Sequence, residues 1–408
     1  GFLATEYLVT LFNITSELEN SFVKTFHTLL FVALLKSALG TFGSLIDAKQ
    51  HIAFLHVRNT VVSLLTTMLT LVFLFLDYGI LSFGYGLLFE ALIMPFVDIT
   101  YLRIIDKKII FFPIKTSKKE IISLFKFGGP FQILKITNLV NTNVDNIFIA
   151  AIIGAASVPV YVFSGKLAFL FSVFLIGIIP SMLFPGISQL FEQKDLNKIS
   201  NVYFKLSNMA LRMGILFGVI YFILNKSFVS AWVGIENYAG YSLTLIFIIW
   251  IILESFIRGI TIIVYSSGKI YGLALVTIFE AGVKIILTLL LIPSIGLVGA
   301  VLATLLSRIM SLFFIPITIN KTLKIQTFEF IKNLFHESIV YSIPTITFAF
   351  LMHNYIGAEI DSLKQAFIFA FLAFIINIVS FEGLFLIRQK GLKWRDRVSL
   401  LLRNLFSV

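Results

Sequence analysis

Apolar residues in this chain fall in blocks of about twenty, each long enough to cross the hydrocarbon core of a membrane as a helix. A chain in lipid must satisfy its backbone polar groups internally, so such blocks predict a bundle of transmembrane helices. Glycine, proline and charged residues separate the blocks and predict an all-α polytopic membrane protein with eleven spans. The spans cover residues 24–45, 56–77, 79–105, 124–153, 157–186, 202–224, 240–265, 269–294, 296–318, 331–353 and 363–388.

Composition narrows the chemistry available to the chain. Hydrophobic residues make up 58% of it and charged residues 13%, far from the values of water-soluble domains. Cysteine is absent, which excludes disulfides, thiolate metal sites and cysteine nucleophiles. The 5 histidines are scattered without metal-ligand spacing. We therefore expect a protein that works within the bilayer, is not an enzyme and uses no cofactor beyond a proton or sodium counter-ion.

Lysine and arginine gather in alternate loops, 23 on one side of the predicted membrane and 3 on the other. The positive-inside rule then places the loop at residues 106–123 and the C-terminal tail in the cytoplasm. The net charge of +11 reflects this topology and contact with anionic lipids, and we do not expect nucleic-acid binding.

An internal repeat relates two outer turns, one around Gly79 and the other around Gly296, with an offset of 217 residues. Repeated six-helix bundles with a site at their interface are a recurring transporter plan. The repeat predicts half of a first lobe at residues 1–105, a cytoplasmic linker at 106–123, a six-helix lobe at 124–318, two additional helices within 331–388 and a basic tail at 389–408. Because the first repeat unit would begin roughly ninety residues before Gly1, about three spans are expected to be missing from an intact protein of about fourteen.

Residues 135–146 place polar side chains within an otherwise apolar span. On a helix the polar positions fall within about 140° of one another. They are Lys135, Asn138, Asn141, Thr142, Asp145 and Asn146. A charge facing hydrocarbon costs about 2.5 to 3.5 kcal/mol, so this stripe must face water, protein or a polar ligand. It predicts one wall of a polar cavity.

Several short patterns resemble the second lobe of Wzx-type polysaccharide flippases, within the MOP superfamily that also holds multidrug extruders and the lipid II flippase. These patterns are Phe127-Gly128-Gly129-Pro130, Asp145, the turn at 153–156, Val160-Tyr161, Gly165-Lys166-Leu167, Pro180, Pro185, Ser267-Gly268-Lys269 and the small-residue run at 296–304. The resemblance implies fourteen helices in two lobes around a central cavity. It also implies transport of an undecaprenyl-pyrophosphate-linked oligosaccharide across the bacterial inner membrane, alongside other polysaccharide-assembly membrane proteins.

Three cations, Lys135, Lys166 and Arg212, lie on consecutive predicted spans and are expected to converge on the pyrophosphate. The amides of Asn138 and Asn141 offer donors and acceptors to sugar hydroxyls. The same residues would also suit ion pairs and hydrogen bonds that hold the bundle together.

Two further groups of charges are candidates for supporting roles. Asp145 or Glu90 is expected to bind the coupling proton or sodium ion, and Lys36 and Arg308 are secondary cavity cations or snorkelling side chains. Two i, i+4 spacings predict simple helix-face pairs. They are Glu254 with Arg258 and Glu280 with Lys284.

Two other functions remain open. A multidrug extruder of the same fold would favour acidic residues around its cationic substrates, and the three predicted cations weigh against it. A membrane glycan polymerase or ligase would need a large outer loop, whereas the longest outer connection, residues 225–239, is short.

Overall fold

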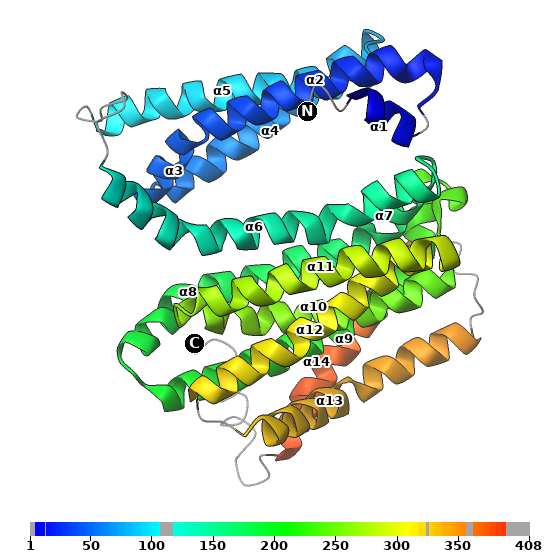
Figure 1. Ribbon diagram of the computed structural model, residues 1–408. Coiled ribbons are helices and arrows are strands. Elements are labelled where there is room, and N and C mark those ends of the chain that lie inside the picture. The colour runs from blue at the N-terminus through cyan, green and yellow to red at the C-terminus, as the bar shows by residue number, and fades with distance from the viewer. Residues whose placement is uncertain (1–4, 13, 107–116, 324–325, 356–361, 389–408) are drawn as a thin grey trace. The chain divides into compact units, whose positions relative to one another are not determined.

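The computed structural model describes residues 5–12, 14–106, 117–323, 326–355 and 362–388, and these residues fold into helices joined by short turns (Figure 1). The elements are α1 (Thr5–Leu11), α2 (Ser16–Leu39), α3 (Thr41–Ala48), α4 (Ile52–Phe75), α5 (Leu81–Ile105), α6 (Lys118–Ile152), α7 (Ser157–Phe169), the π-helix η2 (Leu170–Leu175), α8 (Ile176–Glu192), α9 (Leu196–Val233), the 3-10 helix η3 (Ile235–Asn237), α10 (Tyr241–Ser266), α11 (Ile270–Ile295), α12 (Leu297–Leu323), α13 (Thr327–Tyr355) and α14 (Leu363–Arg388). Every predicted span corresponds to one helix or, at 24–45 and 157–186, to consecutive helices, so the predicted all-α fold class is confirmed. The predicted tail at 389–408 and most of the linker lie outside the described residues.

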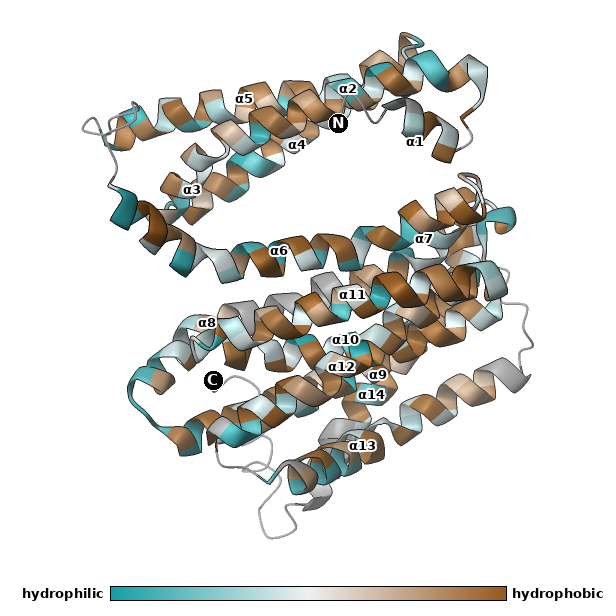
Figure 2. Cartoon of the chain, in the orientation of Figure 1, coloured by the Kyte–Doolittle hydropathy of each residue, from teal (hydrophilic) through white to brown (hydrophobic). Residues whose placement is uncertain are grey.

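Eight helical stretches in the described part of the chain are long and apolar enough to cross a membrane. They correspond to α2 with α3, α4 and the helices from α9 to α14. Figure 2 shows the apolar colour along most of the length of these helices. The remaining predicted spans are α5, α6 and the continuous helical segment formed by α7, η2 and α8. Two of these three helices carry buried carboxylates, Asp98 on α5 and Asp145 on α6.

The chain divides into two compact units, Gly1–Ser117 and Lys118–Val408. The division falls inside the segment that the sequence predicts as a linker. In unit 1, both α2 and α4 pack against α5, and Arg58 of α4 forms an ion pair with Asp98 of α5. The side chains of this pair are 10% and 4% exposed, so the pair ties two helices together inside the unit.

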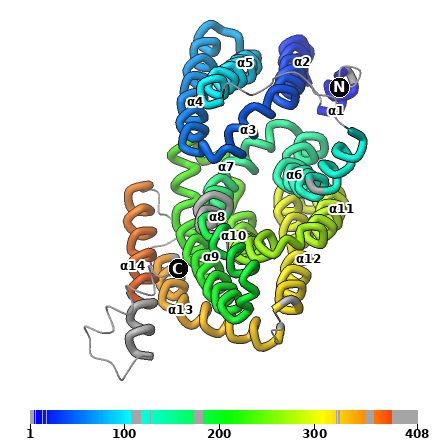
Figure 3. Tube along the Cα trace, turned by 90° about the vertical axis from the view of Figure 1, so that its left-hand side faces the viewer, coloured from blue at the N-terminus to red at the C-terminus, as the bar shows by residue number. Residues whose placement is uncertain are grey.

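Unit 2 is built around the long helix α9, which packs against α10, α13 and α14 (Figure 3). Next to it, α12 packs against both α10 and α11, and α6 packs against α11. Large buried side chains such as Tyr221, Phe247 and Trp250 fill the core between α9 and α10. At the start of α9, Asp195 accepts a hydrogen bond from the backbone N–H of Lys198 at 3.1 Å, which lowers the pKa of that carboxyl.

The two units contain matching helical hairpins. The hairpin of α4 and α5 turns at Gly79 with φ +54°, and that of α11 and α12 turns at Gly296 with φ +62°. Both glycines adopt the left-handed backbone that other residues avoid. The turns before the hairpins also match, with φ 62° at Gln50 and 72° at Gly268. The sequence repeat is thus accompanied by a repeat of backbone geometry.

Candidate functional site

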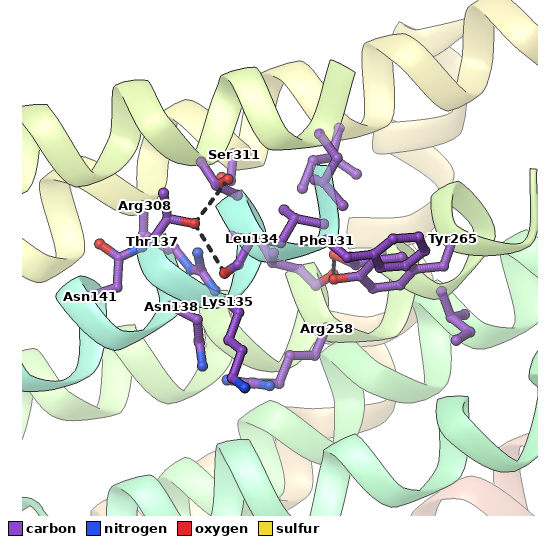
Figure 4. Close-up of a pocket in the computed structure, with 16 residues that line it drawn as sticks. Phe131, Leu134, Lys135, Thr137, Asn138, Asn141, Arg258, Tyr265, Arg308 and Ser311 are labelled. Carbon is purple, nitrogen blue, oxygen red and sulfur yellow. Dashed lines mark hydrogen bonds between the residues drawn. The ribbon is translucent and has the colours of Figure 1, made fainter. Parts of the chain in front are cut away.

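A pocket of about 590 Å³ opens in unit 2 between α6, α10, α11 and α12 (Figure 4). Its volume lies in the range of small-molecule sites in proteins. The polar residues that line it are Lys135, Thr137, Asn138, Asn141, Arg258, Thr261, Thr277, Arg308 and Ser311. Phe131, Leu134 and Tyr265 contribute apolar surface to the same pocket. The pocket therefore combines cations and amides with an aromatic wall.

The polar stripe of α6 supplies one wall of this pocket. Lys135, Asn138 and Asn141 all line the pocket, as the helical spacing of the stripe predicts. Ile136 and Leu139 lie between them in sequence and are 59% and 55% exposed, away from the polar face. The amphipathic pattern thus directs the polar face of α6 to a pocket within unit 2.

Arg258 of α10 is the cation that shares the pocket with Lys135. Its Nε lies 2.7 Å from Glu254, and its side chain is 29% exposed. Figure 4 shows the Lys135 ammonium and the Arg258 guanidinium pointing to the same part of the pocket. Glu254 contacts Arg258 at its Nε, so the other guanidinium N–H groups and the Lys135 ammonium offer donors of the kind that bind a phosphate-bearing ligand.

Arg308 of α12, which also lines the pocket, lies in a network of carboxylates. Its Nε and Nη2 donate to Glu254 at 2.7 and 3.0 Å, and its Nη1 donates to Glu280 at 2.6 Å. The Ser311 hydroxyl donates to Glu280 as well. Because the carboxylate side chains are only 3% and 2% exposed, Arg308 is held as a structural cation at the edge of the pocket.

Asp145 lies beyond the pocket in a second buried network. Its Oδ2 accepts hydrogen bonds from the Lys284 ammonium at 2.9 Å, the Tyr161 hydroxyl at 3.0 Å and the Thr304 hydroxyl at 3.0 Å. Lys284 also donates to the backbone carbonyl of Asn141. The Lys284 and Asp145 side chains are 1% and 3% exposed, so the pair is sealed from solvent and from the pocket.

The structure does not bring Lys166 and Arg212 into this pocket. Lys166 is exposed on α7, whereas Arg212 of α9 lies 4.8 Å from the centre of the Tyr341 ring on α13. One turn earlier, Asn208 donates to Glu337 of α13 at 2.8 Å. Arg212 therefore belongs to the contact between α9 and α13.

The remaining candidates lie in unit 1. The Lys36 ammonium contacts a carboxylate oxygen of Glu90 at 2.8 Å, so these two predicted residues neutralise each other. Both line a second pocket of about 490 Å³.

Two features of the site were not predicted from the sequence. Arg258 forms the predicted pair with Glu254 but also lines the pocket. Glu280 and Lys284 share a helix face, yet they bind Arg308 and Asp145 on other helices instead of each other. No local pattern on α10 identifies Arg258 as a pocket residue, because the pocket is formed together with residues of α6, α11 and α12. In the part of the chain that the structure describes, no group of three or more His, Cys, Asp or Glu residues could hold a metal ion.

Comparisons with known proteins agree with this architecture. Residues 1–191 match the model of a family described as polysaccharide biosynthesis protein. Among solved structures, the chain is similar to one titled "Lipid II flippase MurJ, inward closed conformation", with a TM-score of 0.67 and 16% identity, over 94% of this chain and 79% of that one. No curated protein sequence matches the chain. The predicted family resemblance is thereby confirmed, and the structural match extends the shared fold across unit 2.

Proposed function

We propose that this protein flips a prenyl-diphosphate-linked oligosaccharide across the bacterial inner membrane. It would do so by alternating access, with its C-terminus in the cytoplasm. The family match concerns polysaccharide biosynthesis and the similar solved structure is a flippase of a lipid-linked precursor, which supports this class of substrate. The observation that carries the proposal is the convergence of Lys135 and Arg258 in one pocket beside the amides of Asn138 and Asn141.

The pocket suits the head of such a substrate. Lys135 and Arg258 would bind the diphosphate through charge-assisted hydrogen bonds, since both line the pocket and carry N–H donors. The amides would bind the adjoining sugar, because an amide both donates to and accepts from hydroxyls. An inside-negative potential would favour outward release of the anion by about 2.3 kcal/mol per charge for each 100 mV.

The charges of the pocket also separate this proposal from a multidrug extruder. Of the described residues, the charged ones that line the pocket are the cations Lys135, Arg258 and Arg308. Glu254 and Glu280 offset the charge of the two arginines, so Lys135 contributes most of the attraction for a diphosphate. The proposal therefore disfavours lipophilic cations as substrates of this pocket.

We do not expect Asp145 to bind a coupling sodium ion. The Lys284 ammonium already neutralises Asp145 at 2.9 Å, so a sodium ion would have to displace a buried charge. We expect flipping in proteoliposomes to persist when choline replaces sodium. Loss of transport in sodium-free buffer would overturn this part of the proposal.

The experiment that tests the function uses cells deleted for the intact gene and complemented with wild type, Lys135→Ala, Arg258→Ala or Lys205→Ala. Lys205 is an exposed lysine on α9 outside the pocket, so Lys205→Ala is the matched control. Lipids are extracted, and prenyl-linked glycans are quantified by mass spectrometry with and without a periplasmic probe.

We expect wild type and the control to clear the glycans. The two pocket variants should leave them in the cytoplasmic leaflet at normal protein levels. Full rescue by Lys135→Ala and Arg258→Ala would exclude the pocket as the site. Accumulation on the periplasmic side would point instead to a polymerase or ligase.

A further inference from the structure

The pocket of unit 1 is the repeat counterpart of the pocket of unit 2. Eight residues that line the unit 1 pocket have an equivalent in the repeat, 218 positions later in the sequence. All eight equivalents line the unit 2 pocket. Examples are Leu55 with Leu273, Asn59 with Thr277, and Glu90 with Arg308. Leu55 and Leu273 lie on α4 and α11, and Glu90 and Arg308 lie on α5 and α12, so corresponding helices carry corresponding residues around both pockets.

The two pockets differ in charge. Among the described residues, three cations and no carboxylate line the unit 2 pocket, whereas two cations and three carboxylates line the unit 1 pocket. The unit 1 cations are Lys36 and Arg58, and the carboxylates are Asp47, Glu90 and Asp98. At the position of Arg308 the unit 1 pocket has Glu90, and at that of Arg258 it has Gly40. A diphosphate that is attracted to the unit 2 pocket would therefore be disfavoured in the unit 1 pocket.

The charges of the unit 1 pocket are largely compensated by pairing. Arg58 pairs with Asp98 deep in the unit, and Lys36 pairs with Glu90 at the pocket wall. The Lys36 and Glu90 side chains are 40% and 20% exposed, which leaves N–H donors and carboxylate lone pairs facing the open space. Asn59 and an exposed His56 add further donors and acceptors.

We propose that the unit 1 pocket is a separate binding site for the neutral, hydroxyl-rich sugars of the glycan. Each hydroxyl both donates and accepts, so it matches a wall that alternates N–H donors with carboxylate and amide oxygens. The pocket volume of about 490 Å³ suits a ligand of one or two sugar rings. This inference rests on the proposed function, since it assigns the sugar part of the same substrate.

The test exploits the absence of cysteine from the chain. Ser44→Cys places a single thiol in the unit 1 pocket, and Thr261→Cys places one in the unit 2 pocket. The purified full chain in detergent reacts with a maleimide, and the rate is measured with three probes. The probes are inorganic pyrophosphate, tetraphenylphosphonium and the neutral repeat-unit oligosaccharide that mild acid releases from the prenyl-linked pool of the cells.

We expect the oligosaccharide to slow labelling of Ser44→Cys, by about threefold at a concentration twice the Kd, because the rate falls as 1 + [L]/Kd. Pyrophosphate should leave Ser44→Cys unchanged and slow Thr261→Cys. Adding Glu90→Leu to Ser44→Cys should abolish the protection by oligosaccharide, since this change removes both carboxylate oxygens while keeping a side chain of similar size.

The outcomes separate the two proposals. No effect of oligosaccharide on Ser44→Cys, or protection of that thiol by pyrophosphate, would overturn the sugar site. Protection by tetraphenylphosphonium would do so too, in favour of an organic-cation site. Failure of pyrophosphate to protect Thr261→Cys would instead count against the proposed function. The effect of oligosaccharide on the labelling of Ser44→Cys would still test the sugar site.

Discussion

Two ion pairs occupy equivalent positions of the internal repeat and have opposite polarity. Lys36 of α2 pairs with Glu90 of α5 in unit 1, and 218 residues later Glu254 of α10 pairs with Arg308 of α12 in unit 2. The first pair is 40% and 20% exposed, whereas Arg308 and Glu254 are 18% and 3% exposed. The same place in the fold thus holds a more exposed pair in unit 1 and a more buried pair in unit 2, where Arg308 still lines the pocket.

The difference comes from what surrounds each pair. In unit 2, α6 packs against α11, and Glu280 of α11 and Ser311 of α12 complete the network around Arg308. An exposed pair contributes little to stability, while breaking a buried pair leaves an uncompensated charge. A repeat position can therefore serve ligand binding in one unit and bundle stability in the other.

The largest expected effect follows from Arg308→Met. The substitution removes the cation shared by two buried carboxylates, Glu254 and Glu280, and should lower the free energy of unfolding by about 3 to 5 kcal/mol. Thermal unfolding of the purified protein in detergent, followed by circular dichroism, measures the loss. Adding Glu280→Gln should restore much of the stability, because Glu254 still pairs with Arg258 and no buried carboxylate then remains without a cation. An Arg308→Met protein that unfolds at the wild-type temperature would show that the network is not sealed.

Lys284→Met should have the next largest effect, about 3 kcal/mol, because it leaves Asp145 buried without a counter-ion. The loss is smaller than for Arg308 since the hydroxyls of Tyr161 and Thr304 still donate to the single carboxylate. The same unfolding experiment applies. The double variant Asp145→Asn with Lys284→Met is the control and should recover most of the loss. A double variant no more stable than Lys284→Met alone would contradict the pairing.

Lys36→Met should have the smallest effect, below about 1 kcal/mol, because the pair with Glu90 is exposed. The difference from wild type should shrink further in high salt, which screens exposed charges. Unfolding curves at low and high salt measure both effects. A loss as large as that of Arg308→Met would mean that the two repeat positions are equally buried, and the comparison between the units would fail.

Much of the fold could be predicted from local sequence patterns. Runs of apolar residues predicted the helices, since each span must bury its own backbone hydrogen bonds in lipid whatever its neighbours are. The offset between Gly79 and Gly296 predicted a repeat, and both residues have a positive φ angle. The polar stripe of α6 predicted that Lys135, Asn138 and Asn141 share a face, and they line one pocket.

The ion-pair partners of the buried charges could not be predicted in this way. Spacing along α11 suggested a pair between Glu280 and Lys284, but Lys284 binds Asp145, 139 residues away. Asp145 shares the stripe of α6 with Lys135, yet it lies in a sealed network outside the pocket. Helical spacing shows which side chains share a face, and carries no information about which other helix covers that face.

The sequence by itself determined a polytopic helical membrane protein, its spans, its repeated turns and the polar face of α6, because these follow from local hydropathy and helix geometry. Only the tertiary structure decided which charges stay open to a ligand and which become buried pairs. The physical reason is that an ion pair depends on the distance and burial of groups on different helices, and packing alone sets both.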